Sequence, residues 1–340
     1  MTVLNVAMFG NDELAKEIAK ATDQRDVHTY VHKETHDGAV KIISIIRPAR
    51  YPERLRPLLN AISAGRVGII EIGSIDATLG EVLVAFASSN IKRGIAVIKP
   101  KEGDWVDQEM AEKMFQQAGL NEWKFMMPDG LEIRNQLYAL MAEIEDELAE
   151  SAASPLVVSI DQHFNVKGIG LVAIGYVQCG TLNVHDELHI LPSKVGGNTK
   201  SLQVMDDDVP QAKSGDRVGI AIRGAKDESL SNGSMIVKPA IEDKKTNTNI
   251  PLAVIEQKIS KLTLQTSPFQ KRVLAEGDVI HIGVDLQFTV GRIKSVEADS
   301  MVVEWDSPVY IRRENPGSAI IAQLDSKPRI IGSSTVHLHE

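Results

Sequence analysis

Residues 1–150 alternate between short apolar runs and segments with apolar residues at helical spacing. The apolar runs read as strands, of which 27–31 is the weakest: 3–9, 27–31, 40–46, 67–72, 95–98 and 123–127. The intervening segments read as helices, most with one apolar face: 13–21, 52–63, 77–89, 106–118 and 131–149. Strands that alternate with helices in this way predict a mostly parallel, doubly wound α/β sheet.

The pattern changes after residue 150. Small residues and a proline at 150–155 form a short linker. Beyond it, β-rich runs are broken by glycine, which lets a strand bend or a neighbouring backbone approach. These glycines are Gly168, Gly170, Gly175 and Gly180. After a polar hinge at 243–247, further strands fall near 252–258, 278–282, 285–291, 301–305 and 317–322. We therefore predict an α/β domain at 1–150 and two all-β barrels at 155–240 and 250–340.

Composition and charge argue against a membrane protein, a secreted protein and a protein with a basic surface overall. The chain has no apolar run long enough to span a membrane and no secretory signal pattern at its N-terminus. Its one cysteine, Cys179, cannot form an internal disulfide, which fits the cytoplasm. Residues 1–150 carry 17 Lys and Arg against 24 Asp and Glu, a net charge of −7 within a total of −9. Because nucleic-acid binding depends on basic surface, any RNA contact must come from a local patch.

Two long motifs stand close together in the first predicted barrel. The first is a G-x-G-x-V-x-x-G run from Gly168 to Gly175, followed by the turn at Gly180. The second, AKSGDRVGIAIRG, runs from Ala212 to Gly224. Together they resemble the second domain of translational GTPases of the EF-Tu type, most closely the selenocysteine-specific (SelB) branch. The stretches 291–296 and 315–317 resemble the family's third domain less specifically.

The resemblance implies a GTPase-like domain ahead of two β-barrels. SelB factors carry a further C-terminal domain, whereas this chain stops after the third. We therefore expect a SelB-like paralogue without the fourth domain. The resemblance covers 155–240 strongly, 250–340 moderately, and 1–150 by architecture alone.

The phosphate-binding motif of this family is degenerate. A G-x-x-x-x-G-K-[ST] loop holds phosphates with backbone amides and a lysine, and Mg²⁺ with the hydroxyl. Here Gly10 and Lys16 remain, but Glu17 replaces the hydroxyl residue, and Asp12 and Glu13 add carboxylates. These carboxylates would repel a triphosphate.

The other GTPase motifs are degenerate as well. Residues 47–52 lack the Asp and His of D-x-P-G-H, 98–101 keep only Lys99 of N-K-x-D, and 126–129 lack the Ser-Ala signature. We predict that GTP hydrolysis is lost, that the chain has no catalytic residue and is not an enzyme, and that no cofactor, GTP and Mg²⁺ included, is bound. His28 and its neighbours at four-residue spacing lie in an extended segment, so we predict no metal site.

In the EF-Tu family the second domain holds the 3′ end of aminoacyl-tRNA on its barrel face. Carried over to this sequence, the resemblance implies a tRNA or partner face made of Phe164, Gly168, Ile169, Gly170, Ile174, Gln203, Arg217 and Arg223. Apolar side chains on such a face can pack a base. Alternatively, they fill the barrel core or its contact with the first domain, and Arg217 is a structural strand residue. Candidate phosphate contacts in the third domain are Lys271, Arg272, Arg312 and Arg313.

These observations support one leading function and two alternatives. The leading hypothesis is a translation elongation factor-like protein that binds tRNA, the ribosome or a translation partner without a GTP switch. The first alternative is a divergent factor that still binds GTP through Gly10 and Lys16. The second is a scaffold or regulator whose acidic domain binds a basic protein. None of these readings involves a membrane.

Overall fold

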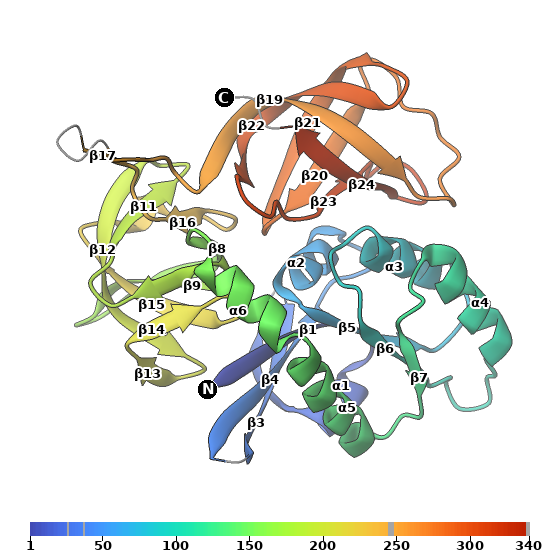
Figure 1. Ribbon diagram of the computed structural model, residues 1–340. Coiled ribbons are helices and arrows are strands. Elements are labelled where there is room, and N and C mark those ends of the chain that lie inside the picture. The colour runs from blue at the N-terminus through green and yellow to red at the C-terminus, as the bar shows by residue number, and fades with distance from the viewer. Residues whose placement is uncertain (26, 37, 244–247, 338–340) are drawn as a thin grey trace.

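The computed structural model describes residues 1–25, 27–36, 38–243 and 248–337. An α/β domain is followed by two β-barrels, and the barrels lie against it from two sides (Figure 1). This architecture confirms the predicted fold class. Most of the polar hinge, residues 244–247, lies outside the described residues.

The α/β domain is built on one sheet. Its strands are β1 (Thr2–Phe9), β2 (Lys20–Gln24), β3 (Val27–His36), β4 (Ala39–Pro48), β5 (Val67–Ile72), β6 (Gly94–Ile98) and β7 (Lys124–Met126). The helices are α1 (Asp12–Ile18), α2 (Arg56–Ala64), α3 (Ala77–Ala87), α4 (Gln108–Ala118), α5 (Gly130–Glu143) and α6 (Glu145–Ala153). The strand order is β2-β3-β4-β1-β5-β6-β7, in which β4, β1, β5, β6 and β7 are parallel.

The two faces of this sheet carry separate cores, as expected of a doubly wound sheet. Along β1, Val6 and Met8 belong to the core that includes residues of α1 and α5. Ala7 belongs to the other core, with residues of α2, α3 and α4. This alternation follows from the period of two along a strand.

The first predicted helix is wrong at its C-terminal end. α1 stops at Ile18, and the chain turns directly into β2, which pairs antiparallel with β3. The hydroxyls of Thr22 and Thr29 lie 2.8 Å apart across this pair. Residues 20–24 alternate exposed and half-buried positions and have little apolar face of their own. Pairing with β3 therefore decides their conformation, which local periodicity does not reveal.

The second domain is a closed barrel. Its main strands are β8 (Val157–Val166), β9 (Gly170–Cys179), β11 (Glu187–Leu191), β12 (Val195–Val204), β15 (Arg217–Arg223) and β16 (Met235–Val237). They run in the order β11-β16-β8-β9-β15-β12, and β12 pairs with β11 to close the ring. Shorter elements complete it: β10 (Thr181–Asn183), β13 (Asp207–Val209), β14 (Gln211–Lys213) and the 3-10 turn η1 (Asp227–Ser229).

The third domain is also a closed barrel, reached through the pair β17 (Ile241–Asp243) and β18 (Thr248–Ile250). Its strands are β19 (Val254–Thr266), β20 (Val279–Val284), β21 (Gln287–Val296), β22 (Ser300–Arg312), β23 (Ala319–Ala322) and β24 (Ile330–His337). They close in the order β19-β22-β21-β20-β23-β24. Trp305, fully buried, donates from its indole to the Ser260 hydroxyl (2.9 Å) in the core.

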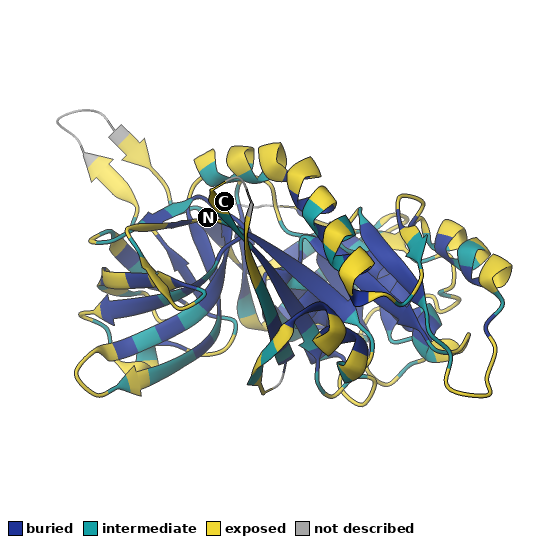
Figure 2. Ribbon diagram, turned by 90° about the horizontal axis from the view of Figure 1, so that it is seen from below, coloured by how far each residue is buried: buried dark blue, intermediate teal, exposed yellow. Residues whose placement is uncertain are grey.

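Polar contacts join the α/β domain to both barrels. Asn5 donates to the carbonyl of Gly215 in the second domain (2.8 Å). Glu81 on α3 pairs with Arg329, which directly precedes β24 in the third domain (2.5 Å). Figure 2 shows the sheet strands buried between outer helix surfaces that remain exposed. Within the described residues, no helix is both long and apolar enough to cross a membrane.

Candidate functional site

The turn after β1 is occupied by a side chain of the protein itself. Glu71, buried on β5, accepts hydrogen bonds from the Asn11 backbone N–H (2.7 Å) and from Asn11 Nδ2 (2.6 Å). A Cβ placed on Gly10 would lie 2.8 Å from Glu71 Oε2, so the carboxylate packs directly against the turn. Burial raises the pKa of Glu71. A carboxyl group thus sits where the resemblance implies a nucleotide phosphate.

The two lysines retained from the GTPase motifs are both paired with carboxylates. Lys16 Nζ lies 2.5 Å from Asp12, which also accepts a hydrogen bond from the Tyr30 hydroxyl (2.5 Å). The Lys16 ammonium is the main reason why the pKa of the Asp12 carboxyl is lowered. Lys99 Nζ lies 3.2 Å from Glu17. Both ammonium groups therefore already have a counter-ion.

Arg47 extends the same network. It stands in the segment where the resemblance implies D-x-P-G-H, and its guanidinium donates to the carbonyl of Gly10 (3.3 Å) and to the Tyr30 hydroxyl (3.2 Å). It also lies 2.9 Å from His28 Nδ1. The loop that would surround a nucleotide is therefore connected to β3 and β4 by the chain's own side chains.

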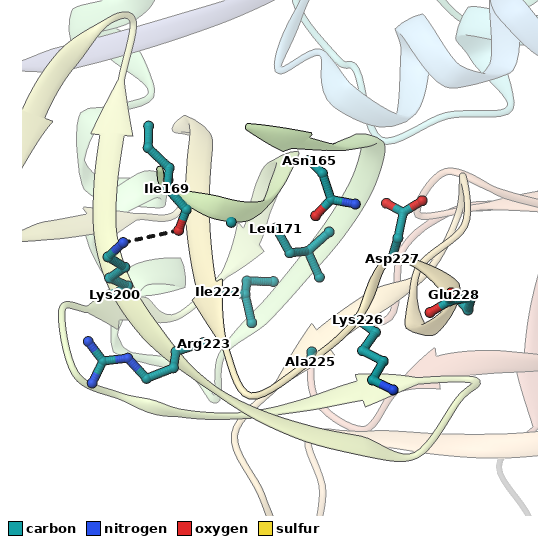
Figure 3. A pocket seen from close by; sticks show the side chains of 11 residues that line it. Asn165, Ile169, Leu171, Lys200, Ile222, Arg223, Ala225, Lys226, Asp227 and Glu228 are labelled. Atoms are coloured by element: carbon teal, nitrogen blue, oxygen red, sulfur yellow. Dashed lines mark hydrogen bonds between the residues drawn. The ribbon is translucent and has the colours of Figure 1, made fainter. Parts of the chain in front are cut away.

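Three of the predicted barrel-face residues gather at one end of the second domain. Ile169, Gly170 and Arg223 line an open hollow of about 490 Å³ (Figure 3). The turn that bears Ile169 contains Gly168 and Gly170 at φ +85° and +102°, a region that favours glycine. The carbonyl of Ile169 accepts a hydrogen bond from Lys200 Nζ (3.0 Å), which holds this turn against β12.

The hollow has apolar side chains at its floor and charged side chains around its rim. Figure 3 shows Leu171 and Ile222 between the Ile169 turn and the segment that follows β15. The remaining lining residues are Asn165, Lys200, Ala225, Lys226, Asp227 and Glu228. Lys200, Arg223 and Lys226 supply three cations against two carboxylates. An apolar floor with cations at its edge can pack a base and hold a phosphate.

Sequence reasoning missed Lys200 and Lys226. Lys200 falls at an irregularity in the pairing of β12 with β15, between Thr199 and Ser201, which no periodicity announces. Lys226 could have been found, because it follows the second family-like motif by two residues.

Phe164, Ile174 and Gln203 lie outside the hollow, on the outer surface of the sheet. Ile174 pairs in register with Gly219, and Gly219 pairs with Gln203 on the next strand. Phe164 and Ile174 are half-buried, while Gln203 is exposed and donates to Asp208 (2.9 Å). The structure thus divides the predicted face between the hollow and this sheet surface.

Arg217 belongs to neither part of the face. Its guanidinium reaches to 4.0 Å from Asp23 on β2 of the α/β domain. Nearby, Gln162 accepts a hydrogen bond from Arg25 (2.6 Å) and donates to Asp23 (3.1 Å). Arg217 therefore contributes to the contact between the first two domains.

The four predicted phosphate contacts of the third domain differ in their surroundings: two make internal contacts and two are exposed. Arg312 is buried and donates to both oxygens of Asp285 (2.9 and 3.2 Å), so its guanidinium is already bound by a carboxylate of the chain. Arg313 donates to the carbonyl of Leu252 (2.9 Å). Lys271 and Arg272 are exposed, although Arg272 lies 3.5 Å from Asp278. Across the described residues, no three His, Cys, Asp or Glu side chains gather as metal ligands would.

Comparison with known proteins adds sequence and structural matches. The family of elongation factor Tu domain 2 matches residues 170–237. An uncharacterized protein of Methanocaldococcus jannaschii is 29% identical over 84% of this chain and 85% of its own length. The selenocysteine-specific elongation factor of the same organism is 32% identical over 59% of this chain, but the match spans only 40% of that factor.

The solved structure of translation elongation factor SelB from Methanococcus maripaludis in its apo form superposes with a TM-score of 0.78. The match covers 100% of this chain and 80% of that one, at 18% identity. At this identity the superposition shows the shared fold alone. The sequence matches to the domain 2 family and to part of the selenocysteine-specific factor, taken with this shared fold, fit an EF-Tu/SelB-type family member.

Proposed function

We propose that this protein is a translation elongation factor-like protein that binds RNA, in the first instance tRNA, through its second domain and without hydrolysing GTP. The observation that carries the proposal is the hollow at the end of that barrel, where Ile169, Gly170 and Arg223 meet Lys200 and Lys226. Its apolar floor suits a stacked or packed base, and its cations suit the adjoining phosphates. We place this activity in the cytoplasm, with the translation machinery; the ribosome or a translation factor is the partner if tRNA is not.

The turn after β1 supports the absence of a GTP switch. A phosphate that entered there would meet the Glu71 carboxylate, which already accepts a hydrogen bond from the Asn11 backbone N–H. Two like charges 4 Å apart repel by about 4 kcal/mol at the effective dielectric constant typical of such sites. Without γ-phosphate and Mg²⁺ contacts, the usual ordering of switch loops has no driving ligand. This geometry disfavours the alternative of a divergent GTP-binding factor.

Calorimetric titration with GTP, GDP or ATP in the presence of Mg²⁺ should therefore detect no binding in the micromolar range. Lys16→Ala should give the same null result, because its ammonium is committed to Asp12. A micromolar dissociation constant in the native protein that Lys16→Ala weakens would contradict the proposal and favour the GTP-binding alternative.

Aminoacyl-tRNA and deacylated tRNA should both be titrated by fluorescence at low salt. We expect binding that weakens with salt, because phosphate contacts release counter-ions. Lys200→Ala and Arg223→Ala should each weaken binding roughly fivefold and reduce the slope of log K against log salt by about 1.

The matched controls are Lys113→Ala on α4 and Arg54→Ala, which remove exposed cations from the α/β domain. They should leave the affinity within twofold of the native value. Absence of binding to either tRNA at low salt, or equal losses in the controls and the hollow variants, would refute tRNA binding at this site.

A further inference from the structure

A second cavity lies where the three domains meet. It is at the N-terminal ends of the parallel strands, whereas the degenerate nucleotide site is at their C-terminal ends. Its volume is about 680 Å³. The α/β domain contributes the segments that lead into β5 and β6 and part of α6, the second domain contributes Gln178 and Ser214, and the third contributes Asp285, Arg312 and residues 315–318. These segments precede the parallel strands, whereas the turn at Gly10 follows one. The cavity is therefore separate from the site that the GTPase resemblance concerns.

Arg66 is a cation of the cavity wall that forms no ion pair with any carboxylate of the described residues. It directly precedes β5, and its guanidinium donates to the carbonyl of Gln178 (2.9 Å). Its Nε is buried without a hydrogen-bond partner among the described residues, and none of their carboxylates pairs with it. Burial, together with the nearby Arg312, lowers the pKa of Arg66. A buried donor without an acceptor carries a free-energy cost, so the Arg66 guanidinium is held in the cavity wall with incomplete hydrogen bonding.

Within the described part of the chain, no carboxylate of the cavity wall forms an ion pair with Arg66, although Asp285 is near enough to interact with it electrostatically. Asp285 is committed to Arg312, and Glu147 lies 3.0 Å from Arg93. Lys92 stands exposed on the rim, and Glu150 is the remaining lining carboxylate. Serine hydroxyls and amides supply most of the other polar groups: Ser63, Ser89, Asn90, Ser151, Gln178, Ser214, Asn315 and Ser318. The wall therefore offers one half-buried guanidinium, an exposed cation and an exposed carboxylate at the rim, and many hydrogen-bonding groups.

We propose that the junction cavity binds a small phosphate-bearing ligand, with its phosphate on Arg66 and its polar body along the serine and amide wall. The volume falls in the range of ordinary small-molecule sites. An arginine fork matches the oxygens of a phosphate. The same chemistry fits free phosphate and a phosphate monoester. Because the wall comes from three domains, the bound ligand would hold them together.

Thermal unfolding and calorimetry with inorganic phosphate, pyrophosphate and AMP test this proposal on the full chain, with adenosine as the uncharged control. We expect a saturable rise in Tm with at least one of the three anions and none with adenosine, because a ligand that binds only the folded state stabilises it. AMP binding at least tenfold tighter than phosphate would identify a monoester as the ligand. Equal affinities would identify the free anion.

Arg66→Gln should weaken this binding by at least about tenfold, because hydrogen bonds to a charged group are lost. Arg54→Gln removes an exposed arginine elsewhere on the α/β domain and should leave binding unchanged. Asn90→Trp should block the entrance while leaving Arg66 in place, which keeps the test informative if Arg66→Gln unfolds. No saturable binding of any of the three anions at millimolar concentration, or unchanged affinity in both cavity variants, would overturn the proposal.

Discussion

Replacing Arg329 with alanine should lower the free energy of unfolding by about 3–5 kcal/mol, because it leaves Glu81 buried without its partner. Arg329 donates to Glu81 from Nε (3.0 Å) and Nη2 (2.5 Å), and the Tyr51 hydroxyl donates to the same carboxylate (2.8 Å). The Glu81 and Arg329 side chains are only 9% and 15% exposed. Since the pair joins α3 to the third domain, we also expect these domains to separate more readily. Urea unfolding followed by tryptophan fluorescence measures the loss.

The same pair gives an acid-sensitive contribution to stability. Burial alone would raise the pKa of Glu81, but the hydrogen bonds from Arg329 and Tyr51 outweigh it and hold this pKa below its usual value near 4.5. A carboxyl whose pKa is lower in the folded state stabilises the fold above pH 4.5, and this contribution is lost as pH falls through the folded value. Arg329→Ala should therefore destabilise the protein much less at acidic pH than at pH 7.

The double variant Glu81→Met with Arg329→Met is the control for this pair. Because no buried charge then remains unpaired, it should recover most of the stability that Arg329→Ala loses. If Arg329→Ala costs less than about 1 kcal/mol at pH 7, the range of exposed pairs, the contact does not hold the two domains together.

Asp285→Ala should destabilise the third domain by about 3–5 kcal/mol, for the same physical reason. It removes both acceptors of the Arg312 guanidinium, whose side chain is 8% exposed. A Cβ on Gly317 would lie 2.6 Å from Asp285 Oδ1, so the neighbouring loop packs closely on this carboxylate. Circular dichroism during urea unfolding should show the loss as a lower midpoint.

Asp299→Ala, which removes an exposed carboxylate from the same barrel, should change stability by less than about 0.5 kcal/mol. The paired replacement Asp285→Leu with Arg312→Met should restore much of the lost stability, because both charges are gone. Equal effects of Asp285→Ala and Asp299→Ala would show that the Arg312 pair does not stabilise the barrel.

The turn after β1 shows what the sequence motifs can predict and what they cannot. The sequence predicts that Glu17, Asp12 and Glu13 spoil the phosphate loop, since these residues are adjacent along the chain. It does not indicate that Glu71 fills the turn, because Glu71 lies 60 residues away from Asn11 and reaches it only through the pairing of β5 with β1. The apolar run at 67–72 contains one buried carboxylate, that of Glu71, and the order of the strands determines that its partner is Asn11.

In the candidate face of the second domain, too, the sequence predicts one part and tertiary packing decides the other. The glycine motif predicts breaks in the strands at Gly168 and Gly170, and the structure has a turn there in which both glycines adopt positive φ angles. Whether Arg223 or Arg217 accompanies that turn depends on which end of β15 each occupies and on what packs there. Arg223 lies in the hollow, whereas Arg217 meets Asp23 of another domain.

Local pattern alone was enough to predict the alternation of strands and helices and the succession of an α/β domain and two barrels. These features follow from residues close together in the chain, whose spacing sets which face is apolar. The tertiary structure alone decided that residues 20–24 form a strand and that Arg312 pairs internally with Asp285. It also decided that Arg66 lines a three-domain cavity without an ion pair to any of the described residues. Each of these depends on groups brought together from distant segments, where burial and partner geometry outweigh local preference.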